Sequence, residues 1–230
     1  MLMKSRLQSA FTLIEMLVVI SIIAILAAFA VPALTSALTK GQMTGTMNNG
    51  RQLYLAAQQM ALDGSANSDP NLAWPGDYAP LPNLSQYMTR LVDNDYLKVG
   101  DVQKLLSGPG ASAAVTSDNA TPPTITVAGT AAFKIYPVTE SDAANVIFAV
   151  SRNYVYDTAL VAANGGVPNN PFGQKGFVVQ RKGGDAAILR ANNATDLGNI
   201  PQFEAQVGKK PGDAQGVANP GDPANMMKQP

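Results

Sequence analysis

The feature that most constrains this chain is the apolar stretch from Phe11 to Leu34. It follows a short basic leader, and no charged residue occurs from Met16 to its end. A helix needs roughly 20 apolar residues to cross the hydrocarbon core of a bilayer. The stretch is therefore long enough to span a membrane once.

One carboxylate, Glu15, lies near the start of this apolar stretch. An ionised carboxylate within a membrane helix costs about 2.5–3.5 kcal/mol on insertion scales. A passive anchor has no use for such a charge, and an ionisable residue in a membrane helix indicates a functional site with a partner. Glu15 is therefore the leading candidate functional residue.

Two ordinary interpretations of this N-terminus compete. In the first it is a signal anchor, with Lys4 and Arg6 holding the leader in the cytoplasm. In the second it is a secretory signal peptide with a small-x-small site at 28–30, cleaved after Ala30. Neither explains Glu15, and the apolar core exceeds the roughly 7–15 residues usual for secretory signals.

The residues AFTLIE at positions 10–15, followed by MLVVISIIAIL, closely resemble the prepilin signal of type IV pilins and type II secretion pseudopilins. The resemblance implies that a prepilin peptidase cuts between Ala10 and Phe11 and methylates the new amine of Phe11. It also implies a helix kink at Pro32. One departure is Ala10, where the family usually has glycine. Alanine is the nearest substitute in size, so we expect slower processing at worst.

Cleavage would place a cationic amine at Phe11 in the same apolar layer as Glu15. An isolated charge in such a layer is costly, whereas a paired charge is tolerated. If Glu15 of one subunit pairs with the amine of a neighbour, the cost is relieved only on assembly. The pair would then set the register of a helical bundle. The alternative is that Glu15 reaches the membrane interface and pairs with nothing.

Composition limits the remaining function classes. With 230 residues, 46% of them hydrophobic, the chain can form one modest globular domain beyond the anchor. Its net charge of zero gives no basic surface for nucleic acid. Cysteine and histidine are absent, which excludes disulfides, thiol catalysis, histidine triads and histidine-ligated zinc. We expect neither an enzyme nor a cofactor.

The helical pattern is expected to continue to about Leu62. Apolar or small residues recur at helical spacing, at Leu53, Ala56, Ala57 and Met60. Gly64 then predicts the end of the helix. Three glycines within 41–50 each cost roughly 1 kcal/mol relative to alanine, which predicts a soft segment. Two helices joined by a polar hinge are the alternative.

A loop rich in Asn, Asp, Pro and Gly is expected at 65–84, with Trp74 as its anchor in the core. A short helix follows at 85–92, with Ser85 as N-cap and with its inward residues Tyr87, Met88 and Leu91. A second short helix is expected at 99–106.

The acidic turn 93–95 between these helices alternates oxygen ligands, which can suit calcium. The glycine and the distal glutamate of an EF-hand are missing at their spacings. We interpret the turn as solvated and assign no metal site.

The second half of the chain predicts an antiparallel sheet. Residues 107–129 resemble a surface insertion with one strand at 124–128. Further extended segments are expected at 131–138, 145–150 and 154–156. The glycine pair 183–184 predicts a two-residue hairpin turn between strands 176–182 and 185–190. The Gly- and Pro-rich tail from 208 onward is expected to be disordered.

Residues 170–173, NPFG, resemble the Pro-aromatic-Gly turn that precedes a strand in major pseudopilins. This second resemblance favours a pseudopilin over a type IV pilin.

The predicted fold class is α+β and pilin-like, with a long N-terminal helix, membrane half plus soluble half, packed on a small antiparallel sheet. The expected organisation is a leader (1–10), a transmembrane and assembly helix (11–34), a soluble half of the helix (35–64), a globular domain (65–207) and a tail (208–230).

The resemblance implies a structural subunit of a type II secretion filament in the periplasm. The subunit would sit in the bacterial inner membrane as a single-pass protein, with its N-terminus cytoplasmic and its globular domain periplasmic. Its partners would be copies of itself, other pseudopilins, the prepilin peptidase, an assembly ATPase, a membrane platform and lipid, but no nucleic acid. The alternatives are a type IV pilin for adhesion, motility or DNA uptake, and a secreted or anchored protein cleaved after Ala30.

Overall fold

The computed structural model describes residues 12–118, 120, 122–154, 172, 175–189 and 227. The chain divides into two units, Met1–Gly41 and Gln42–Pro230, called here the anchor unit and the globular unit. The predicted leader, most of the predicted tail, and the last two residues of the extended segment expected at 154–156 lie outside the described residues. Each unit is considered by itself.

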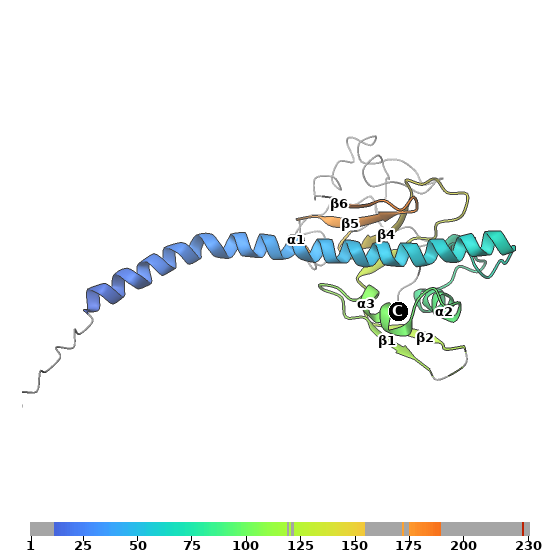
Figure 1. Ribbon diagram of the computed structural model, residues 1–230, viewed down its shortest axis with the longest axis horizontal. Helices are drawn as coiled ribbons and strands as arrows, with labels where there is room; N and C mark the ends of the chain where they lie inside the picture. Colours follow the sequence, from blue (N-terminus) through green and yellow to red (C-terminus); the bar gives the residue numbers. More distant parts are fainter. Residues whose placement is uncertain are drawn as a thin grey trace, which may run out of the picture. The chain divides into compact units, whose positions relative to one another are not determined.

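The longest element, α1, is a single helix from Leu13 to Asn67 (Figure 1). The predicted soft segment at 41–50 is helical throughout, so the alternative of two helices with a hinge is wrong. One glycine of this segment, Gly50, is required by the packing of the helix against the sheet. A Cβ there would lie 3.1 Å from the ring of Phe133, and the bare backbone lets the helix lie close to the sheet.

Gly64 does not end α1 as predicted, because the helix continues to Asn67. A Cβ at Gly64 would lie 1.6 Å from the main-chain oxygen of Leu72, so this glycine lets the following loop cross the helix. The chain leaves the helix at Ser68, whose φ of 54° is left-handed. The N–H of Asp69 then donates to the carbonyl of Gly64 at 2.9 Å, which satisfies one of the last helical acceptors.

Three short helices follow: η1 (Pro75–Asp77), α2 (Leu84–Asp93) and α3 (Val99–Leu106). The bounds of α3 are those predicted. The predicted N-cap of α2 is wrong, because Asn83 caps it and forms a capping box with Gln86. The Ser85 hydroxyl instead accepts from the N–H of Val127 at 3.0 Å, which joins α2 to a strand.

Within the described residues, six strands form two antiparallel sheets. The bounds of the strands are β1 (Ala114–Ser117), β2 (Ile125–Ala128), β3 (Phe133–Ile135), β4 (Ile147–Ser151), β5 (Phe177–Arg181) and β6 (Ala186–Leu189). The first two strands pair with each other, and the other four form a sheet in the order β3-β4-β5-β6. In the globular unit this sheet lies on one side of α1, and α2, α3 and the β1–β2 pair lie on the other (Figure 1). The chain is thus α+β, as predicted.

The expectation of only one strand in the segment 107–129 is wrong. Strand β1 pairs along its length with β2, and the side chain of Gln103 on α3 holds its beginning. The Gln103 amide donates to the carbonyl of Ala113 at 2.9 Å and accepts from the N–H of Val115 at 2.7 Å. These hydrogen bonds join residues 10 and 12 positions apart, and such contacts leave no local signal in the sequence.

The predicted hairpin is present as β5–β6, but its turn differs. Gln180 pairs with Ala186, and the N–H of Arg181 donates to the Asp185 carbonyl at 2.9 Å, which leaves three residues in the loop. The last of them, Gly184, has a φ of 93°. A three-residue hairpin needs a left-handed residue at this position, and glycine supplies it.

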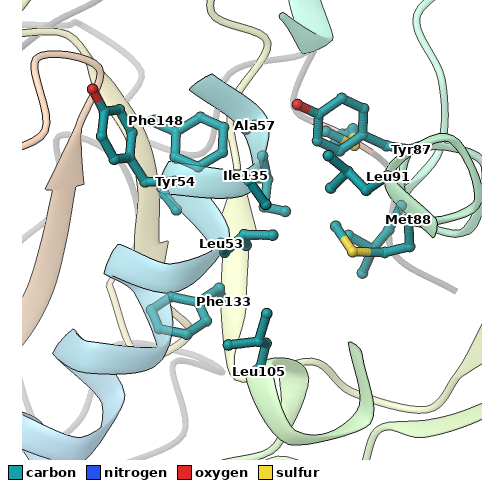
Figure 2. Packing of buried hydrophobic residues seen from close by; sticks show 14 of the residues in the cluster. Leu53, Tyr54, Ala57, Tyr87, Met88, Leu91, Leu105, Phe133, Ile135 and Phe148 are labelled. Atoms are coloured by element: carbon teal, nitrogen blue, oxygen red, sulfur yellow. The ribbon is translucent and has the colours of Figure 1, made fainter. Parts of the chain in front are cut away.

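In the core of the globular unit, α1 packs against the four-stranded sheet on one side and against α2 and α3 on the other (Figure 2). Leu53 and Ala57 of α1, and the three predicted inward residues of α2, are fully buried. Trp74 is an anchor in the core as predicted: it is 4% exposed, and its ring centroid lies 6.1 Å from that of Tyr54 and 5.7 Å from that of Phe148.

Two residues, Phe172 and Met227, are described although most of their neighbours in the sequence are not. Phe172, from the predicted turn 170–173, is 3% exposed and packs in a small cluster with Met43 and Val178. Met227, from the predicted tail, is 1% exposed, and its N–H donates to the carbonyl of Ile135 at 3.2 Å. Met227 is therefore part of the core.

Candidate assembly segment

The anchor unit presents an apolar helical surface without cover. Among the described residues, α1 is the one helix long and apolar enough to cross a membrane. Its most apolar window of 18 residues has a mean hydropathy of 2.9, and none of that window is buried. An apolar surface of this size requires lipid or other apolar helices around it.

Glu15 is bonded to Thr12, the residue before the first helical position. Both the hydroxyl and the main-chain N–H of Thr12 donate to Oε2 of Glu15, at 2.6 and 2.8 Å. The N–H of Glu15 donates in return to the Thr12 hydroxyl at 3.3 Å. This is the capping-box arrangement, in which a residue pair three apart satisfies the free N–H groups of a helix start.

The second carboxylate oxygen of Glu15, Oε1, receives no hydrogen bond from any residue in the described part of the chain. The carboxylate can therefore cap its own helix through Oε2 and accept from a further donor through Oε1. The charge of Glu15 identifies this residue in the sequence, whereas Thr12 is not among the predicted site residues. The Thr-x-x-Glu spacing of a capping box is the signal that identifies it.

The predicted processing residues Ala10 and Phe11 lie outside the described residues. Cleavage between them and the pairing of Glu15 with the amine of Phe11 therefore stay predictions. Pro32 lies inside α1 and does not end it. Its missing N–H removes one helical hydrogen bond, and the kink predicted there also stays a prediction.

The hydroxyl groups of the anchor unit bond to their own helix. Ser21 donates to the carbonyls of Leu17 and Val18, and Thr35 donates to the carbonyl of Pro32 at 2.9 Å. Hydroxyls satisfied in this way can face hydrocarbon, where no water is present to bond them. The helix is therefore compatible with lipid along this whole stretch.

The acidic turn considered for calcium serves to end α2. Asn94 is the C-cap, and its N–H donates to carbonyls of the last helical turn. Asp95 follows with a φ of 62°. Within the described ranges, no group of three or more acidic side chains is placed to hold a metal ion.

Two features together define the pilin-like class of proteins. The first is an uncovered apolar helix whose N-terminus is capped by a carboxylate, and the second is a small α+β unit into which that helix continues. Residues 5–31 match the model of the prokaryotic N-terminal methylation motif. The chain is 30% identical to a type IV major fimbrial protein FimA of Dichelobacter nodosus over 152 residues, which cover 66% of this chain and 76% of that protein. It therefore belongs to the type IV pilin family.

A second FimA of the same organism is 39% identical over 72 residues, which are 31% of this chain and 46% of that protein. No solved structure is a significant match to the chain. The motif and the apolar helix fit a pilin-like protein that is anchored in the inner membrane.

Proposed function

We propose that this chain is the structural subunit of a type IV filament on the cell surface. The observation that carries the proposal is the apolar face of α1, which is uncovered over its most apolar window. Helices of neighbouring subunits would cover this face in a filament, and lipid would cover it before assembly. Proteins of this family are generally structural, and we propose no catalytic role.

The register of the filament would be set by Glu15. Removal of the leader between Ala10 and Phe11 creates an amine, and Oε1 of Glu15 is the acceptor that the capping box leaves unused. A neighbour's amine at Oε1 would neutralise the carboxylate inside an apolar bundle. Because a buried charge is costly without its partner, subunits placed out of register would be disfavoured.

The orientation follows from the leader. Lys4 and Arg6 would remain on the cytoplasmic side by the positive-inside rule, which places the globular unit on the periplasmic side. The prepilin peptidase would act on the cytoplasmic side. An assembly ATPase and a membrane platform would then move processed subunits out of the membrane.

A surface filament is proposed ahead of a periplasmic secretion filament because the relatives described above are fimbrial proteins. The pseudopilin remains the second candidate, favoured by the NPFG sequence at 170–173. Electron microscopy of intact cells that express the chain distinguishes them. Long surface filaments labelled by an antibody support the first candidate, and their absence alongside a secretion defect in the deletion strain supports the second.

The N-terminal sequence and intact mass of the protein from cells test the processing step. A chain that begins at Phe11 and is heavier by one methyl group is expected. A chain that begins at Met1 or Val31 would overturn the proposal in favour of a simple anchor or a secreted protein.

The role of Glu15 is tested by Glu15→Ala beside a matched variant, Thr12→Ala. Thr12→Ala removes the hydroxyl of the cap but keeps the carboxylate, and we expect it to assemble filaments. Glu15→Ala should be inserted and processed but assemble poorly. Wild-type amounts of filament in Glu15→Ala, or an equal defect in both variants, would remove the pairing and leave helix capping as the role of Glu15.

A further inference from the structure

A pocket of about 580 Å³, lined by both polar and apolar residues, lies beside α2 in the globular unit. Its walls come from the loop before α2, from α2 itself and from Thr124 ahead of β2. The volume falls in the range of roughly 300–1,000 Å³ that is typical of small-molecule sites. The filament proposed above makes no use of this pocket.

The cation in the lining is Arg90. Its guanidinium carbon lies 4.3 Å from the centroid of the Tyr78 ring. That ring is fixed by its hydroxyl, which donates to the carbonyl of Asn71 and accepts from the N–H of Ala73, both at 2.9 Å. A guanidinium that lies over an aromatic ring is attracted to the ring face without using its N–H donors as hydrogen-bond donors.

Those donors have no acceptor within the described ranges, since Arg90 forms neither an ion pair nor a side-chain hydrogen bond there. The pocket therefore contains a preorganised fork of donors with its positive charge uncompensated by a paired carboxylate. A carboxylate of a ligand matches this fork, because two parallel N–H···O bonds can form at once.

Two other side chains of the lining have unused hydrogen-bonding groups. Asp77 accepts from the N–H of Glu140 at 2.9 Å through Oδ2, and among the described residues nothing donates to Oδ1. Gln86 uses its amide oxygen in the capping box of α2, which leaves its amide N–H₂ available. The lining thus offers one carboxylate acceptor and one amide donor besides the guanidinium.

We propose that this pocket binds a small hydroxylated monocarboxylate of the hexuronic acid class. The ligand carboxylate pairs with the guanidinium of Arg90. Its hydroxyls donate to Asp77 and accept from the amide of Gln86, while Pro80 in the lining meets the carbon skeleton. The negative charge of Asp77 disfavours a second carboxylate, and a neutral sugar leaves the guanidinium unpaired.

Saturation-transfer NMR on the full-length protein in detergent micelles tests the proposal, with D-glucuronate as the probe. Wild-type protein should transfer saturation to glucuronate at least tenfold more strongly than to glucose. Arg90→Gln should reduce the glucuronate signal at least tenfold. Arg51→Gln removes the same charge from an exposed position on α1, outside the pocket, and should leave the signal unchanged.

Equal transfer to glucuronate and glucose, or an unchanged signal in Arg90→Gln, would overturn the proposal. Arg90→Lys guards against loss of folding, because it keeps the charge but not the fork. A glucuronate signal in Arg90→Lys between those of wild type and Arg90→Gln supports the fork. A signal equal to wild type in Arg90→Lys would overturn the pairing of the ligand carboxylate with the guanidinium fork. Filament assembly by Arg90→Gln would show that the variant folds and that the pocket acts apart from assembly.

Discussion

The indole Nε1 of Trp74 donates a hydrogen bond to a carboxylate oxygen of Glu140, 2.7 Å away. The main-chain carbonyl of Glu140 in turn accepts from the ammonium of Lys182 at 2.5 Å, as does the carbonyl of Asp142 at 2.8 Å. The same ammonium lies 5.8 Å from the centroid of the Trp74 ring. Three loops that are far apart in the sequence are therefore joined around one tryptophan.

Replacing Trp74 by phenylalanine should lower the free energy of unfolding by about 2 kcal/mol, through the lost hydrogen bond and the smaller ring. Urea denaturation followed by circular dichroism measures the change. Glu140→Gln keeps an oxygen acceptor for the indole and should cost less. A larger loss in Glu140→Gln than in Trp74→Phe would contradict the assignment.

Two glycines of α1 should respond in opposite ways to alanine. Gly64→Ala brings a Cβ to 1.6 Å from the carbonyl oxygen of Leu72 and should destabilise the globular unit by at least about 2 kcal/mol. Gly45 has no atom within 4 Å of the same position, and Gly45→Ala should stabilise the helix by up to about 1 kcal/mol. Thermal denaturation of both variants, followed by the fluorescence of Trp74 in the globular unit, measures the contrast, and a similar loss in each would contradict it.

Tyr87 and Tyr78 form a second matched pair, with ring centroids 6.4 Å apart. The Tyr87 hydroxyl is buried without a partner among the described residues, and burial raises the pKa of this hydroxyl well above its ordinary value. Tyr87→Phe should therefore stabilise the protein by about 1 kcal/mol. Tyr78→Phe removes two hydrogen bonds and should destabilise it by a similar amount. Equal effects in urea denaturation would argue against this account.

Tyr96 should make stability fall at alkaline pH. Burial, together with the hydrogen bond that its hydroxyl donates to Asp63, raises the pKa of Tyr96 from 10.0 to about 12. Above pH 10 the unfolded chain loses this proton while the folded chain keeps it. Its contribution is thus complete below pH 10 and lost by about pH 12.

The free energy of unfolding measured at several pH values in this window tests the prediction. Tyr96→Phe should show a shallower decline than wild type. An unchanged slope would mean that the buried Tyr54 and Tyr87 and the half-buried Tyr78 account for the decline, since burial raises the pKa of each of them as well.

Local sequence patterns are sufficient where a segment buries one face at a regular spacing. Helix α3 follows from its buried residues Val102, Leu105 and Leu106, which repeat at helical intervals. Trp74 follows from its size and its place among turn residues. Both predictions rest on the side chain itself and need no knowledge of distant neighbours.

The errors arise where a residue serves a distant contact instead of its usual local role. Gly64 is a residue type that ends helices, but here it makes room for the carbonyl of Leu72. Ser85 is a residue type that begins helices, but here it binds the N–H of Val127. Glu15 was found because a charge in an apolar stretch is unusual, whereas Thr12 was missed although its spacing from Glu15 is visible in the sequence.

The two parts of helix α1 are stabilised by different surroundings. Its buried residues all lie from Met43 to Gly64, whereas its most apolar window has no buried residue. A single melting temperature will not describe such a protein in a micelle. The fluorescence of Trp74, the one tryptophan of the chain, reports the unfolding of the globular unit alone. The helical dichroism that survives this transition measures how much of α1 is maintained by the surrounding detergent, without any contribution from the packed core.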